Sequence, residues 1–160
     1  MADIRWADLI EQRPDLAEAG RGLLYQFSVG LAFLSTVRRD GGPRVHPICP
    51  LLTDDGMYGF ITSSPKCEDL RRDGRYALHS FPTDGNEDAF YVTGTAVELF
   101  DGDVRDTLSR QFLRERPTIN LSISDLGEQQ LFEFRLNSCL VTRTNGYGDP
   151  NPRHEIWHAR

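Results

Sequence analysis

The chain has 160 residues and a mass of 18.2 kDa, which is enough for one domain with a substantial core and too little for two. Its formal net charge of -6 at pH 7 argues against a broad surface for nucleic acid or for anionic membranes, because such surfaces need an excess of basic side chains. Any anion site must therefore be a small pocket.

The cysteines and the N-terminus indicate where the protein works. Cys49, Cys67 and Cys139 are odd in number, widely separated and free of any Cys-x-x-Cys spacing, so we expect free thiols in a reducing compartment. The N-terminal residues carry acids and no apolar run of signal-peptide length, and no stretch approaches a membrane span. These features predict a cytoplasmic protein with no membrane partner.

Two helices are predicted before the first strand. Apolar residues recur at near-helical spacing over residues 4–12 and again over residues 16–24, after Pro14. The glycines Gly20 and Gly22 predict a bend in the second helix. We expect residues 1–28 to cover a sheet and to take no part in chemistry.

A hairpin is predicted next. Residues 30–38 are apolar on both faces, as in a strand buried in a barrel wall, and Asp40-Gly41 is typical of a tight turn. The following strand places its side chains alternately, with one face carrying Arg44, His46 and Ile48 and the other carrying Val45, Pro47 and Cys49. Prolines at 43, 47 and 50 cannot donate to a ladder, which predicts an open edge where a flat ring can lie against backbone.

This strand is expected to run to a turn at Asp55-Gly56 and return as residues 57–62. Ser64 then suits a helix N-cap and Pro65 the first helical position, so a short helix should extend to Arg72. The unpaired amides at its start favour an anion. Charged and hydroxyl donors surround the same point, namely Arg44, Thr62, Ser63 and Lys66. An ordinary helix cap with solvated side chains is the competing interpretation.

The second half of the chain continues the β pattern. Strands are predicted over residues 76–81 and 90–100, a helix opens at Asp101, and a long strand region from 131 to 144 is expected to break at Asn137-Ser138. Residues 145–160 form a tail that ends in a strand-like segment. Helices between successive strands are missing, so the fold class is mainly β: one domain over residues 1–160, an antiparallel barrel with covering helices.

Three runs in this order resemble the pyridoxamine 5'-phosphate oxidase-related family. They are residues 31–47, the Thr-Ser-Ser-Pro-Lys run at 62–66, and residues 70–79. The similarity covers residues 24–99 strongly and the terminal Arg-His-Glu-Ile-Trp-His weakly. The resemblance implies the FMN-binding split β-barrel fold and a homodimer whose cofactor sites lie between the subunits.

Carried over position by position, the resemblance also implies a site. The FMN phosphate would be held by Arg44, Thr62, Ser63, Ser64 and Lys66. The flavin ring would lie against the main chain of Val45, His46 and Pro47, with Phe60 and Ile61 nearby and Trp157 of a second subunit as a wall. Pro65-Lys66 stands where true pyridoxamine phosphate oxidases have an Arg-Lys pair, so vitamin B6 oxidation is not expected.

The leading hypothesis is an FMN-dependent oxidoreductase that acts on a small molecule. His46 is a candidate proton donor, because histidine titrates near neutrality, although a strand histidine that only packs is the commoner case. A deazaflavin-dependent reductase is the alternative, with a basic groove formed by Arg71, Arg72 and Arg75. A flavin- or haem-binding module without turnover is a third. His154 and His158 fall on the extended tail, and no metal site is expected.

Overall fold

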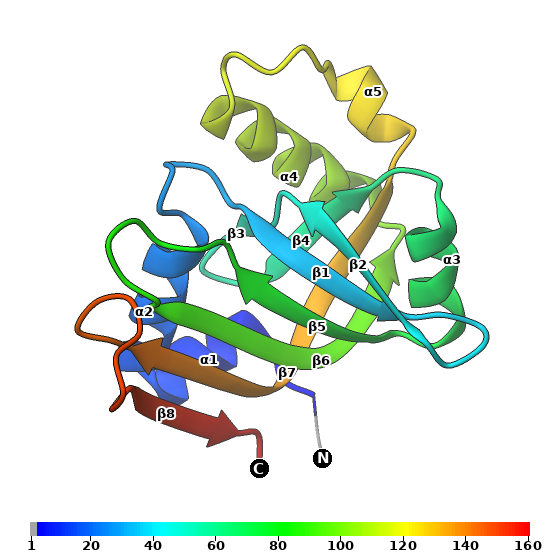
Figure 1. Ribbon diagram of the computed structural model, residues 1–160. Helices are drawn as coiled ribbons and strands as arrows, with labels where there is room; N and C mark the ends of the chain where they lie inside the picture. Colours follow the sequence, from blue (N-terminus) through cyan, green and yellow to red (C-terminus); the bar gives the residue numbers. More distant parts are fainter. Residues whose placement is uncertain (1–2) are drawn as a thin grey trace.

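Figure 1 shows the computed structural model, which describes residues 3–160. Its strands are β1 (Ala32–Val37), β2 (Pro43–Ile48), β3 (Leu51–Leu52), β4 (Met57–Ile61), β5 (Arg75–Ser80), β6 (Ala89–Leu99), β7 (Gln130–Arg143) and β8 (Arg153–His158). Its helices are α1 (Trp6–Gln12), α2 (Pro14–Leu24), α3 (Pro65–Arg72), α4 (Gly102–Glu115) and α5 (Ile123–Gly127). The first two residues of the predicted N-terminal cover lie outside the described part.

The eight strands form one antiparallel sheet that closes on itself. The strand order is β2-β1-β5-β6-β7-β4-β3, and β8 pairs with the second half of β7. The two ends of this order, β2 and β3, are consecutive in the chain and separated only by Cys49 and Pro50. The sheet therefore curls into a barrel, which confirms the predicted fold class, and its seam lies where β2 passes into β3.

The prediction of one strand from Arg44 to the Asp55-Gly56 turn is wrong. The chain forms two strands there, β2 and β3, separated by the seam. Pro50 has no amide to donate, and the chain bends there against Gly30. A Cβ on Gly30 would lie 1.9 Å from the carbonyl oxygen of Pro50, so only glycine permits this approach. The bend lets β2 pair with β1 while β3 pairs with β4.

A buried row of side chains crosses the inner face of the sheet. Leu34, Leu78, Val92 and Cys139 lie opposite one another on β1, β5, β6 and β7, and each is at most 1% exposed. In Figure 1, α1 and α2 lie behind these strands and cover the inner face. A second, smaller apolar cluster lies beneath α4 and includes Leu108. None of the described helices combines the length and the apolar character needed to cross a membrane.

The outer face of the same strands is apolar but exposed. Its central row consists of Pro47, Phe33, His79, Tyr91, Leu140 and Ile156, paired in that order from β2 to β8. Phe33 and Tyr91 are each 36% exposed and Ile156 is 59% exposed. We call these six residues the outer row.

The predicted break in the last long strand is a β-bulge. β7 is continuous, and the pairing shifts so that Ser138 faces Thr93 while Leu136 faces Gly94, leaving Asn137 as the extra residue. A Cβ on Gly94 would lie 1.8 Å from the carbonyl oxygen of Arg135. Glycine is therefore required opposite the bulge.

The predicted bend in α2 is also wrong, because the helix continues to Leu24. Gly20 is buried and faces Phe90, whose ring atoms would lie 2.8 Å from an added Cβ, whereas a Cβ on Gly22 would meet nothing within 4 Å. Gly20 thus serves packing between the helix and the sheet. Gly22 has no comparable contact.

These two glycines give a matched stability test. Gly20→Ala should lower the free energy of unfolding by about 1–3 kcal/mol, because the added methyl group overpacks a filled core. Gly22→Ala should raise it by about 0.5–1 kcal/mol, because alanine is the better helix former. Urea denaturation measures both, and equal effects of the two substitutions would contradict the packing argument.

Candidate anion site

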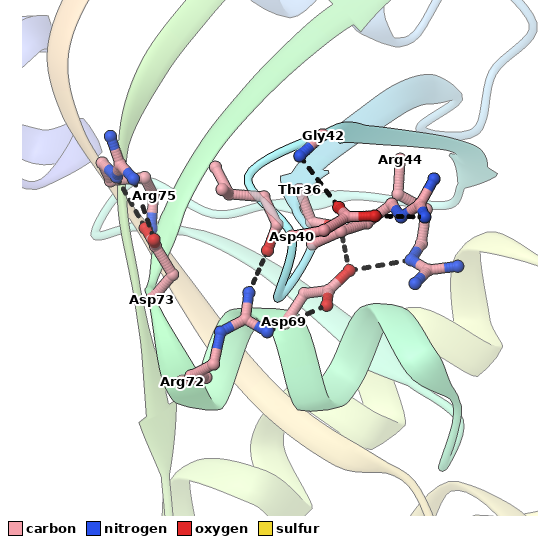
Figure 2. A network of polar contacts seen from close by, with 10 residues as sticks. Thr36, Asp40, Gly42, Arg44, Asp69, Arg72, Asp73 and Arg75 are labelled. Carbon is pink, nitrogen blue, oxygen red and sulfur yellow. Dashed lines mark hydrogen bonds and ion pairs between the residues drawn. The ribbon is translucent and has the colours of Figure 1, made fainter.

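A buried carboxylate ties α3 to the first hairpin (Figure 2). The side chain of Asp69 on α3 is 5% exposed. Its Oδ2 accepts hydrogen bonds from Thr36 Oγ1 on β1 at 2.9 Å and from Arg44 Nε on β2 at 2.7 Å. Its Oδ1 accepts from Arg72 Nη1 at 3.4 Å, and Arg72 also donates to the carbonyl of Val37. Three elements therefore meet on one side chain.

The donors around Asp69 keep it charged. Burial acts to raise the pKa of this carboxyl, but the hydrogen bonds from Arg44 and Thr36 outweigh it, and the pKa lies below its ordinary value. A carboxyl with a depressed pKa contributes stability above its unfolded-state pKa and loses it as pH falls through the folded-state value. The cluster is thus intact at neutral pH and is lost only in acid.

Arg44 presents its remaining donors to a hollow. Its side chain is 28% exposed, and only its Nε is engaged among the described residues. The hollow has a volume of about 600 Å³ and is lined by Arg38, Arg39, Asp40, Arg44, Pro65, Glu68, Asp69 and Arg72. Four guanidinium groups and three carboxylates thus surround it, and one of those carboxylates is buried beneath two of the arginines.

The start of α3 lies at the same hollow. Ser64 occupies the N-cap position as predicted, but it makes no side-chain cap. Its hydroxyl instead donates to the carbonyl of Thr62 at 2.8 Å. No hydroxyl thus competes for the first-turn amides, which favours an anion there. Pro65 lines the hollow.

The other predicted phosphate ligands lie around this helix start. Thr62 and Ser63 are exposed and Lys66 is half-buried, and none of them is among the residues that line the hollow. The structure therefore brings Arg44 and the first turn of α3 together on one hollow. The hydroxyl groups and the lysine remain at its margin.

The predicted ring-binding residues fall into two groups. Val45, His46 and Pro47 are all exposed on β2, the strand at the open end of the sheet order. Ile61 is 2% exposed in the core, and the ring of Phe60 packs 5.5 Å from that of Phe112 on α4. The side chains of Phe60 and Ile61 are therefore committed to packing.

Trp157 lies on β8, which is far from β2 in the sheet. It is half-buried on β8, opposite Cys139 of β7. Four strands, β1, β5, β6 and β7, separate β8 from β2 in the sheet order. One chain therefore does not bring Trp157 and Arg44 together, and the predicted contact of Trp157 with a cofactor requires a second chain.

The three arginines expected to form a basic groove all have carboxylate partners. Arg71 binds Glu98 at 2.6 Å, Arg75 binds Asp73 at 2.6 Å and Arg72 binds Asp69 at 3.4 Å. In Figure 2 the Arg75–Asp73 pair lies apart from the Asp69 cluster. Of these three only Arg72 lines the hollow, together with Arg44 and with Arg38 and Arg39 of the hairpin, and Arg38 is itself paired with Asp40 at 2.6 Å.

Sequence analysis missed Asp69 and Thr36. Thr36 had a signal, because it continues the buried alternation of Ala32 and Leu34, and a polar side chain in such a position needs a buried partner. For Asp69, the neighbouring residues in the sequence gave no signal of a structural role. Its partners on β1 and β2 lie 33 and 25 residues away in the chain.

Comparison with known proteins gives similarity in structure only. No family model matches the chain, and no curated protein matches it. A protein from Clostridium acetobutylicum, related to general stress protein 26 of B. subtilis and of the pyridoxinephosphate oxidase family, has a TM-score of 0.60 at 15% identity, covering 95% of each chain.

Two further solved structures of similar fold are named after the cofactor or ligand that they bind or use. The heme binding protein from Mycobacterium smegmatis has a TM-score of 0.63 at 15% identity, over 91% of this chain and 59% of that one. An F420 reductase has a TM-score of 0.56 at 18% identity, over 68% of this chain and 87% of that one. The chain thus spans little more than half of the heme binding protein. The fold of this chain is the split β-barrel of the pyridoxamine 5'-phosphate oxidase-related proteins.

Proposed function

We propose that this protein is an FMN-dependent oxidoreductase that acts on a small molecule by hydride or electron transfer. The observation that carries the proposal is the hollow between the β1–β2 hairpin and α3, where buried Asp69 holds Arg44 by its Nε. An arginine fork whose outer nitrogens remain available suits a phosphate group, and so does an uncapped helix start. A bound flavin supplies the redox chemistry.

The open edge of β2 supports the position of the ring. Backbone amides alternate in direction along a strand, so the amide of Val45 points to the same side as positions 43 and 47, which are prolines. Prolines are tolerated in a sheet where no ladder bond is required, which is the free edge. Val45 would therefore be the one donor on that edge between the prolines, available to a polar atom of the ring.

We assign a supporting role to His46. Its side chain is exposed and shares the face of β2 that carries Arg44. An imidazole beside a bound flavin can deliver a proton to the reduced ring or to the substrate at neutral pH. No other histidine is carried by the hairpin or by α3.

We infer that the protein is a homodimer and that the cofactor site is completed by the second subunit. The outer row is a mostly apolar band across β2, β1, β5, β6, β7 and β8, with His79 as its one polar member, and bands of this kind on soluble proteins mark contact surfaces. Pairing of two such faces can bring Trp157 of one subunit toward β2 of the other. The three cysteines are free thiols, which fits a cytoplasmic location.

Two alternatives use the same fold, namely a deazaflavin-dependent reductase and a flavin- or haem-binding module without turnover. Arg39 favours the first, because it extends the cationic lining beyond Arg44 and has no ion pair among the described residues, whereas Arg38 is paired with Asp40. Titration of the apo protein with FMN, a deazaflavin and haemin in parallel decides among them. Bleaching of the bound flavin by NADH or NADPH under argon then separates a reductase from a passive carrier.

The phosphate site is tested by removing its cations. Arg44→Ala combined with Lys66→Ala should weaken FMN binding by about 100-fold or more, since each charge-assisted hydrogen bond contributes about 1.5–3 kcal/mol. Riboflavin, which lacks the phosphate, should lose far less. Fluorescence titration measures both ligands, and Arg110→Ala combined with Arg153→Ala, which removes two exposed charges away from the hollow, serves as a charge-matched control. Unchanged FMN affinity in the double variant would reject the site assignment.

The orienting role of Asp69 is tested by Asp69→Asn. An amide cannot hold two guanidinium groups as a carboxylate does, so Arg44 should lose its fixed direction and FMN affinity should fall roughly tenfold. The affinity for riboflavin should stay unchanged, which separates this effect from general unfolding. Tighter FMN binding would show instead that Asp69 acts only by repelling the anion.

The dimer is tested on the outer row. Tyr91→Lys combined with Ile156→Lys places two like charges in a self-complementary interface and should give a folded monomer, because unpaired buried charges are costly. Phe100→Lys is the control, since Phe100 is 83% exposed and lies outside the row. Light scattering after size exclusion gives the mass. A monomeric wild-type protein, or dissociation by Phe100→Lys, would overturn the assignment.

A further inference from the structure

A second cavity lies away from the Arg44 hollow. It has a volume of about 940 Å³ and opens between α4, the β3–β4 turn and the segment before α1, and it shares no lining residue with that hollow. Nothing in the flavin proposal uses this cavity.

The floor of the cavity is a buried carboxylate held between two arginines. The side chain of Glu133 on β7 is 4% exposed. Its Oε1 accepts from Arg5 Nε at 2.6 Å and its Oε2 accepts from Arg135 Nε at 3.1 Å. Arg5 Nη2 also donates to the hydroxyl of Tyr58 at 3.0 Å. Glu133 is thus saturated by two cations, and the group of three side chains carries a net positive charge.

Both arginines keep donors for a ligand. The side chains of Arg5 and Arg135 are 47% and 41% exposed, and both line the cavity. Arg135 uses only its Nε among the described residues. Burial raises the pKa of Tyr58, so this phenol stays neutral at pH 7 and adds no negative charge. An anion would therefore find guanidinium nitrogens here and no unpaired carboxylate on the floor.

The walls add two more cations and an apolar strip. Arg21 of α2 donates to the carbonyl of Thr53 at 3.1 Å and lies 3.6 Å from Asp54 in an ion pair, whereas Arg114 of α4 makes no ion pair within residues 3–160. The acids among the lining residues are Asp54, Asp55 and Asp103, besides Glu133; all three are exposed, and the side chain of Asp54 is fully so. The apolar lining consists of Leu52, Leu99, Val104 and Leu108.

We propose that this cavity binds a small organic carboxylate with an apolar body. The planar carboxylate matches the fork of Arg135 and the outer nitrogens of Arg5, while the apolar body covers the leucines at the base of α4. Inorganic phosphate would leave that apolar strip unused. An organic cation would meet Arg5 and Arg135 on the floor, where Glu133 is already neutralised, and the three remaining acids of the lining are exposed.

Isothermal titration with phenylacetate tests the proposal on the full-length protein. Phenylacetate should bind with saturable heat, and phenylacetamide, its neutral analogue of the same shape, should bind at least about tenfold more weakly because it cannot accept charge-assisted bonds as a carboxylate does. Arg135→Gln and Arg114→Gln should each weaken phenylacetate binding roughly fivefold to tenfold. Arg114→Gln removes no hydrogen bond or ion pair within the described chain, so the fold should be retained.

Two control variants separate this site from general charge effects and from the flavin site. Arg110→Gln removes an exposed charge on the same helix outside the cavity and should leave the affinity for phenylacetate unchanged. Arg44→Ala should also leave it unchanged, even where FMN binding is lost. Absence of saturable binding, equal binding of the amide, or equal weakening by Arg110→Gln would each overturn the proposal. The outcome does not depend on whether FMN binds.

Discussion

The ion cluster on Asp69 is the constraint on which the candidate site depends. A carboxylate with a side chain 5% exposed is costly to bury unless its oxygens are fully paired. Here the partners come from β1, β2 and α3, so the position of the helix, the twist of the hairpin and the direction of Arg44 are fixed together. The fold thereby organises Arg44 before any ligand arrives, which lowers the entropy cost of binding.

The closure of the barrel explains why the site lies on β2. Along the inner face of this strand Ile48 is buried, Arg44 is half-buried and His46 is exposed. β2 is the last strand of the sheet order, so one of its edges is unpaired. The bend at Cys49 and Pro50 that closes the seam through β3 thus creates an open edge beside the cationic hollow. The bend between β2 and β3 is therefore part of both the fold and the candidate site.

Sequence patterns predicted the structural features that depend on neighbouring residues. The features that depend on contacts between distant residues were not predicted. Helix 65–72 was predicted to the residue, because Ser64-Pro65 is a start signal that needs no tertiary contact. The break at Pro50 and the bulge at Asn137 depend on which strands pair, which periodicity does not reveal. The partners of Asp69 depend on the same pairing. Hence the sequence indicated the helix start beside the hollow but not the carboxylate that orients Arg44.

The two cavities share one arrangement of charges on their floors, which resolves an apparent conflict with the net charge of -6. In each, a buried acid lies beneath two arginines: Asp69 beneath Arg44 and Arg72, and Glu133 beneath Arg5 and Arg135. The acid cancels one of the two positive charges and holds Arg44, Arg5 and Arg135 by their Nε atoms, so outer nitrogens of these three arginines remain for a ligand. Screening over about 8 Å at physiological salt limits the influence of acids elsewhere on the surface. An acidic protein can therefore attract anions at chosen points, provided that it buries the carboxylates that hold its arginines.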